Sequence, residues 1–129
     1  MKSFTDIEQS KKLAEILPLD SADMWWSYFY DVVSDYGEYD KEPMLHKPVC
    51  NPAEAIPCWS LAALIDIFPC NKESPIVNLT RGGWNPSFTR RWFATWEDED
   101  KNVLYSADGI NSVDAVVELI LKLHEQKLL

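Results

Sequence analysis

The segment that most constrains the fold is the C-terminal stretch 112–125, whose periodicity indicates a helix that is apolar on most of its surface. Its polar side chains form only a narrow stripe, and Asn111 or Ser112 can cap its N-terminus. Aliphatic side chains fill most of the remaining surface: Val113, Val116, Val117, Leu119, Ile120, Leu121 and Leu123. Such a helix buries most of its sides, so we expect it to be deeply packed.

The strand pattern begins at residues 24–33, where aromatic and β-branched side chains dominate. Both alternating faces of this segment are largely apolar, which predicts an interior strand. Shorter strands are predicted over residues 75–80, 89–96 and 103–106, with a polar hairpin loop at 97–102.

Two further helices are indicated. Thr5 and Glu8 have the spacing of a capping box, which predicts a helix that begins near residue 6 and ends before Pro18. Residues 59–68 predict a short, almost wholly apolar helix that needs burial.

The remaining segments predict loops. Residues 35–40 read as a turn, and residues 42–57 form an irregular connection that contains four prolines. The order α-β-α-β-β-β-α predicts an α+β fold, with a mainly antiparallel sheet of about four strands and three helices packed on it. The length suits a single domain over residues 1–129.

Composition narrows the class of protein. The chain has 129 residues, of which 47% are hydrophobic and 26% charged, which is typical of a globular domain. Its net charge is −9, divided as −6 over residues 1–45, +2 over 46–96 and −5 over 97–129. This charge disfavours nucleic acid as a partner, and any anion site would lie near the arginines of the middle block.

The sequence shows no pattern that is typical of a membrane span or a signal peptide. The longest apolar run, residues 56–68, is too short to span a bilayer and is interrupted by Pro57 and Asp66. The N-terminal residues turn acidic at once, without the apolar core of a signal peptide. Three irregularly spaced cysteines indicate free thiols. We therefore expect a cytoplasmic protein with no membrane anchor.

Three stretches resemble a group of small uncharacterised proteins from gut anaerobes and their phages or mobile elements. They are Phe-Thr-Asp-Ile-Glu-Gln-Ser-Lys-Lys-Leu-Ala-Glu-Ile-Leu-Pro-Leu (4–19), Ile-Pro-Cys-Trp-Ser-Leu-Ala-Ala-Leu (56–64) and Val-Glu-Leu-Ile-Leu-Lys-Leu-His-Glu (117–125). The resemblance implies a bacterial or phage setting in the cytoplasm. It implies no activity, ligand or catalytic residue.

Metal-binding patterns are weak. A zinc ion would need ligands from the set His46, Cys50, Cys58, Cys70 and His124, but no two cysteines have the close spacing of a zinc knuckle. Residues 98–102 imitate the start of a calcium loop, but Val103 replaces the turn glycine and Gly109 the final glutamate. We expect buried thiols, a solvated hairpin tip and no cofactor.

Patterns for nucleophilic catalysis are also weak. Ser60 lacks the flanking glycines of an exposed nucleophile elbow. Cys58 needs a nearby histidine, either His46 or His124, to act as a thiol nucleophile. For His124, a partly buried packing role or a contact with the dipole at the helix C-terminus is favoured, and for His46 solvation.

The most suggestive surface combines arginine with tryptophan. In the strand 89–96, alternation places Arg90, Trp92 and Trp96 on one face. The candidate binding residues are Arg81, Trp84, Arg90, Trp92 and Trp96. Arginine and tryptophan are enriched at interface centres, but the same tryptophan face could instead pack against the helices. For a tyrosine cluster at Tyr28, Tyr30, Tyr36 and Tyr39, core packing is favoured.

Three functions remain. The leading hypothesis is a non-enzymatic interaction module for an unidentified protein partner, or a homodimer, that uses the arginine–tryptophan face. The second is a small enzyme that depends on Cys58 or on an acidic pair near His46. The third is an acidic protein that mimics nucleic acid through its negatively charged ends.

Overall fold

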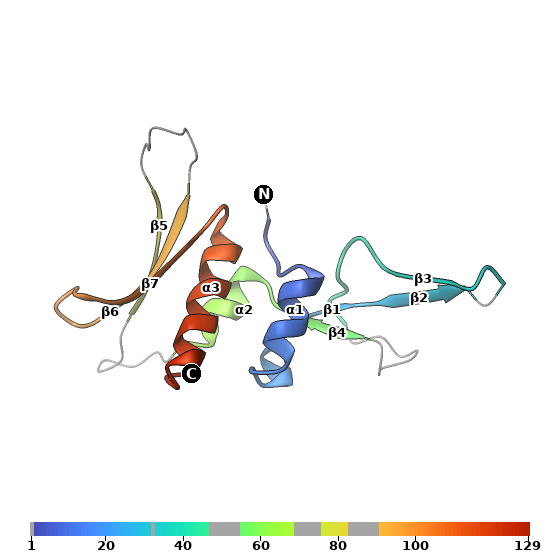
Figure 1. The fold of residues 1–129 in the computed structure, drawn as a ribbon, viewed down its shortest axis with the longest axis horizontal. Coiled ribbons are helices and arrows are strands. Elements are labelled where there is room, and N and C mark those ends of the chain that lie inside the picture. Colours follow the sequence, from blue (N-terminus) through green and yellow to red (C-terminus); the bar gives the residue numbers. More distant parts are fainter. Residues whose placement is uncertain (1, 32, 47–54, 69–75, 83–90) are drawn as a thin grey trace.

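The computed structural model describes residues 2–31, 33–46, 55–68, 76–82 and 91–129 (Figure 1). In chain order its elements are α1 (Ile7–Ala14), the 3-10 turn η1 (Leu19–Ser21), β1 (Met24–Trp26), β2 (Tyr28–Asp31), β3 (Tyr36–Tyr39), β4 (Ile56–Cys58), α2 (Leu61–Asp66), β5 (Ile76–Arg81), β6 (Trp92–Glu97), β7 (Val103–Gly109) and α3 (Ser112–Glu125). The strand pairs are antiparallel, in sheets β1–β4, β2–β3 and β5–β6–β7. The α+β class and the order of the predicted elements are confirmed, and the strands divide among three small sheets.

The C-terminal half consists of the sheet β5–β6–β7 with α3 packed across β7 and β6 (Figure 1). The side chain of Asn111 caps α3 by accepting from the backbone N–H of Asp114 at 2.9 Å. At the end of β7, a Cβ added to Gly109 would lie 2.6 Å from the backbone nitrogen of Ala115. The close approach of strand and helix therefore requires a glycine here.

One hydrophobic cluster joins α1, α2, α3 and β6. Within it, Trp59 is completely buried. The helix predicted over 59–68 is α2, which is shorter because Ser60 is its N-cap. α2 buries Ala63 and Leu64 but leaves Ile65 exposed, so only one side of it belongs to the core.

The predicted capping box of α1 is wrong by one position. The carboxylate of Asp6 accepts from the backbone of Gln9 at 2.8 Å, and the Gln9 side chain accepts from the backbone of Asp6 at 3.1 Å. Thr5 and Glu8 do not form the box. Thr5 is fully buried and its hydroxyl accepts from the backbone N–H of Trp59, so a tertiary contact removes it from the cap.

The strand predicted over 24–33 is present as β1 and β2, separated by Ser27. β1 pairs with β4 and β2 pairs with β3, so one extended segment is shared by two ribbons. Residues 36–39, predicted as a turn, form β3, and residues 56–58 of the proline-rich connection form β4. An interior strand was expected, but only Trp26 in β1 is buried.

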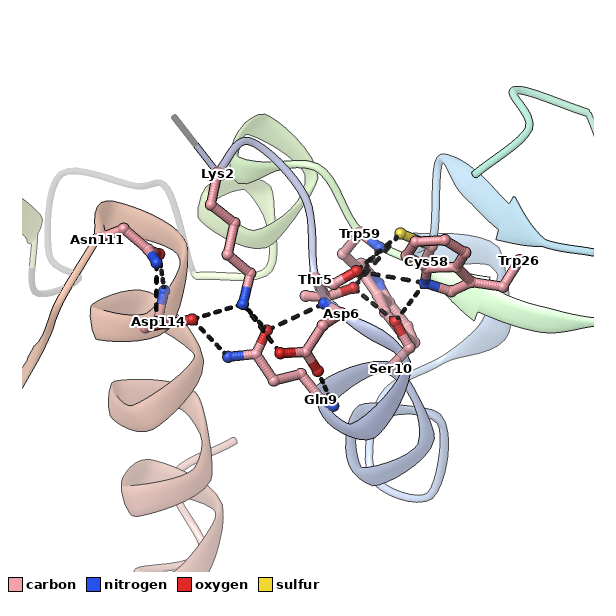
Figure 2. Close-up of polar contacts among 10 residues, drawn as sticks. All are labelled: Lys2, Thr5, Asp6, Gln9, Ser10, Trp26, Cys58, Trp59, Asn111 and Asp114. Carbon is pink, nitrogen blue, oxygen red and sulfur yellow. Dashed lines mark hydrogen bonds and ion pairs between the residues drawn. The ribbon is translucent and has the colours of Figure 1, made fainter. Parts of the chain in front are cut away.

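The N-terminal segment is tied to α3 by side chains (Figure 2). The ammonium of Lys2 lies 2.7 Å from Asp114 Oδ1, and Gln9 donates to the same oxygen at 2.8 Å. These contacts join the first turn of α1 to the first turn of α3. Among the described residues, no helix is long and apolar enough to span a bilayer.

Candidate interaction surfaces

The predicted arginine–tryptophan face is largely core. Trp92, Ala94 and Trp96 share one face of β6, as the alternation predicted. Ala94 is fully buried, Trp96 is only 6% exposed, and half-buried Trp92 packs against the same cluster. Of the two alternatives for this face, packing against the helices holds for Trp96, because α3 packs against β6 and buries this side of the sheet.

The other predicted binding residues are not brought together by the described structure. Arg81 is exposed at the end of β5, where its Cα pairs with that of Trp92. Trp84 and Arg90 lie outside the described residues. Binding by Arg81 stays a prediction.

The opposite face of the sheet is open. Arg91 Nε lies 2.5 Å from Asp108 Oδ2, which is a cross-strand ion pair between exposed side chains. Beside it, Phe93 is 40% exposed, and Val103 and Leu104 are exposed on β7. Within the described strands, this face therefore carries scattered apolar side chains, and its arginine, Arg91, is paired with a carboxylate.

Cys58 belongs to a buried polar cluster that sequence reasoning did not anticipate (Figure 2). Its Sγ lies 3.5 Å from the hydroxyl of Thr5 and 3.4 Å from the carbonyl oxygen of Thr5. The same hydroxyl lies 2.7 Å from that of Ser10, which also accepts from Trp26 Nε1 at 3.2 Å. Burial raises the pKa of the Cys58 thiol, which disfavours the thiolate that nucleophilic chemistry needs.

Neither histidine lies in this cluster. Both are exposed, and His124 Nδ1 is 3.1 Å from the carbonyl oxygen of Leu129 near the end of α3. Of the two roles expected for His124, partly buried packing is wrong because this side chain is exposed, and the dipole contact at the helix C-terminus stays a prediction. Cys50 and Cys70 lie outside the described residues, and no group of three metal-ligating side chains occurs within the described ones.

The remaining candidate groups stabilise local structure. Ser60 caps α2, and Asp23 accepts from both the backbone N–H and the hydroxyl of Ser60, at 2.9 and 2.5 Å. In the 97–102 loop, Asp98 accepts from the backbone N–H groups of Asp100 and Asn102. These hydrogen bonds, led by that from the backbone of Asn102, lower the pKa of Asp98.

The ribbon β2–β3, here called the arm, projects from the helical body to one end of the molecule (Figure 1). On β3, exposed and half-buried residues alternate, so Tyr36 and Glu38 share an outward face and Gly37 and Tyr39 the other. Tyr36 is 59% exposed, so the core packing expected for this tyrosine is wrong. A two-stranded arm has no second layer to bury both of its faces.

The half-buried face of the arm is ordered by aromatic contacts. The rings of Tyr28 and Tyr39 meet edge to face, with centroids 5.0 Å apart. A Cβ on Gly37 would lie 1.9 Å from the hydroxyl of Tyr28, so the ring of Tyr28 lies over this glycine. Lys11 of α1 lies over the ring of Tyr39, 5.8 Å from its centroid, and connects the arm to the body.

Acidic groups are frequent along the arm and where it meets the body. Residues 27–42 contain five acidic side chains and one basic one. A shallow hollow where the arm meets the body is lined by Glu38, Tyr39, Asp40, Lys41 and Glu42.

Comparison with protein-family models, curated proteins and solved structures finds no match to this chain.

Proposed function

We propose that this chain is a non-enzymatic interaction protein whose arm binds an arginine-rich surface of a partner protein. The observation that carries the proposal is the outward face of β3, where Tyr36 is 59% exposed and lies next to the exposed carboxylate of Glu38. An exposed tyrosine that is held on a projecting ribbon has no evident role in the core of this chain.

The arm is held at its base, which lets it present this face in a defined position. The backbone N–H of Asp40 donates to the carbonyl of Ser27 at 2.9 Å, and Trp25 and Met44 exchange two backbone hydrogen bonds of 2.7 Å. Isolated two-stranded ribbons are only marginally stable, so these bonds and the contact of Lys11 with Tyr39 stabilise the arm. Less conformational freedom is then lost when a partner binds.

The chemistry of this face matches a guanidinium group. The hydroxyl of Tyr36 donates to Glu38 Oε2 at 3.2 Å, and the charge of Glu38 raises the pKa of Tyr36. An arginine can stack on the tyrosine ring while its N–H groups donate to the carboxylate. The acidic side chains within residues 27–42 attract a cationic partner and repel nucleic acid and anionic lipid.

Titration with an oligoarginine peptide, followed by backbone amide NMR, tests this function. We expect the largest shifts at residues 36–42. Tyr36→Ser and Glu38→Gln should each weaken binding at least about threefold. Tyr36→Phe, which keeps the ring, should bind like the wild type. Because these side chains are exposed, all of these variants should keep the wild-type circular dichroism spectrum.

The matched control is Glu118→Gln, which removes one exposed carboxylate from α3. It should leave the affinity unchanged. If Glu118→Gln and Glu38→Gln weaken binding equally, binding follows the overall charge of −9. That result would contradict the proposed arm site and favour the nucleic-acid mimic instead.

A further inference from the structure

The sheet β5–β6–β7 ends at β5 on one side, and its hydrogen-bond pattern shows which backbone groups face outward. The N–H of Gly82 donates to the carbonyl of Arg91 at 2.6 Å, which makes this a hydrogen-bonded pair. Such pairs alternate along an antiparallel ladder, so Val77, Leu79 and Arg81 direct their N–H and C=O groups away from β6. β5 therefore presents a row of backbone donors and acceptors at the edge of the sheet.

The two edges of the sheet differ in how they are protected. On β7, the same alternation turns the carbonyl of Ser106 outward, and the ammonium of Lys122 donates to it at 3.0 Å. Lys122 belongs to α3, and a sheet edge covered by a helix is protected against pairing with another chain. Within the described part of the chain, no side chain donates to an outward carbonyl of β5, and its only charged residue is Arg81, at its end. Among the described residues, the sheet edge that no side chain protects is therefore β5.

We propose that two copies of this chain form a two-fold homodimer in which β5 pairs antiparallel with β5 of the second copy, so that one sheet runs through both. The proposal concerns a different surface from the arm and does not depend on arginine binding. Charge selects the second copy as the occupant. With a net charge of −9, two copies repel each other least where acidic residues are absent, and β5 has none.

The hydrogen-bond pattern also selects a register. Pairing centred on Leu79 places Val77 opposite Arg81 of the second copy, so all three outward-facing residues of β5 form hydrogen-bonded pairs. A shift by one pair loses some of these bonds within the described strand. In the centred register Asn78 lies opposite Thr80, and no two like charges face each other across the two-fold axis.

The side chains at the edge agree with this arrangement. Val77 and Leu79 are half-buried on the face that packs against the core cluster. A two-fold axis perpendicular to the sheet brings the Leu79 side chains of both copies together on that face, which covers them further. One strand pair buries less area than a permanent dimer needs, so the dissociation constant should be on the order of tens of micromolar.

Sedimentation equilibrium over a concentration range tests the dimer, and two double variants test the register. Asn78→Lys with Thr80→Lys places like charges opposite each other across the axis. Asn78→Lys with Thr80→Glu places opposite charges there. Both side chains are exposed in the monomer, so the variants should fold alike, which circular dichroism and thermal melting check.

We expect the first double variant to raise the dissociation constant at least about tenfold and the second to keep or lower it. General charge effects predict the reverse for the first variant, because it makes the chain less negative. A wild-type protein that stays monomeric at about 500 µM would overturn the dimer. Equal effects of the two variants would overturn the register. Glu38→Gln should leave dimerisation unchanged, and the β5 variants should leave oligoarginine binding unchanged.

Discussion

Replacing Thr5 with valine tests the buried cluster around Cys58. Valine has nearly the shape of threonine but no hydroxyl. In the native protein this hydroxyl accepts from the backbone N–H of Trp59 at 3.1 Å and lies 2.7 Å from the hydroxyl of Ser10. All of these groups are buried, so no water replaces the lost partner. Thr5→Val therefore leaves the buried N–H of Trp59 without a hydrogen bond and removes one of the two hydrogen bonds of the Ser10 hydroxyl, which still accepts from Trp26 Nε1.

The size of the effect follows from these groups. The N–H of Trp59, which loses its partner, costs about 1–3 kcal/mol, the hydrogen bond lost by Ser10 costs about 1 kcal/mol, and the added methyl group offsets about 1 kcal/mol. We expect Thr5→Val to lower the free energy of unfolding by about 2 kcal/mol. The control Thr5→Ser keeps the hydroxyl and loses one methyl group, which should cost only about 1 kcal/mol.

Urea unfolding followed by tryptophan fluorescence measures both variants, because buried Trp26 and Trp59 report on this cluster. The midpoint should fall while the slope stays constant. A Thr5→Val protein as stable as Thr5→Ser would refute the reasoning, since it would show that the hydroxyl contributes no more than a methyl group.

Three further predictions concern other contacts. Gly109→Ala should destabilise the fold by about 2–3 kcal/mol in urea unfolding, because its Cβ meets the backbone of α3, whereas Gly37→Ala meets only the tip of the Tyr28 ring and should cost less. Burial raises the pKa of Asp114, but hydrogen bonds from Lys2 and Gln9 and the charge of Lys2 together lower it by more. The net result is a pKa below the ordinary value of an aspartate. Its contribution to stability is present above the unfolded pKa of about 3.9 and is lost as the pH falls through the lower folded value, so the stability difference between wild type and Asp114→Asn should shrink below about pH 4. Native Cys58 should resist iodoacetamide at neutral pH and react only after denaturation, as peptide mass mapping would show; rapid labelling of the folded protein would contradict its raised pKa.

Local sequence patterns predicted much of the fold. The apolar periodicity of residues 112–125 located α3 and its buried faces, because a helix that is apolar nearly all round has no stable exposed state. Alternation along β6 correctly placed Trp92 and Trp96 on one face. These features depend on neighbouring residues in the chain, so they can be read without knowledge of the tertiary contacts.

The surfaces depended on contacts between distant segments. Alternation defines two faces of β6 but not which one α3 covers, so the sequence left Trp96 open between a binding face and the core, in which it is buried. Thr5 has the pattern of a helix cap, but its bond to Trp59, far along the chain, outcompetes that local role. Tyr36 is a large aromatic residue in a tyrosine-rich segment, for which core packing was the favoured interpretation. It is exposed because β3 pairs only with β2 in a projecting ribbon. The sequence by itself determined the three helices, the strands of the sheet β5–β6–β7 and the two faces of each, while the tertiary structure formed β3 and β4 by pairing and decided which faces are covered. Burial is a property of contacts that local periodicity does not encode.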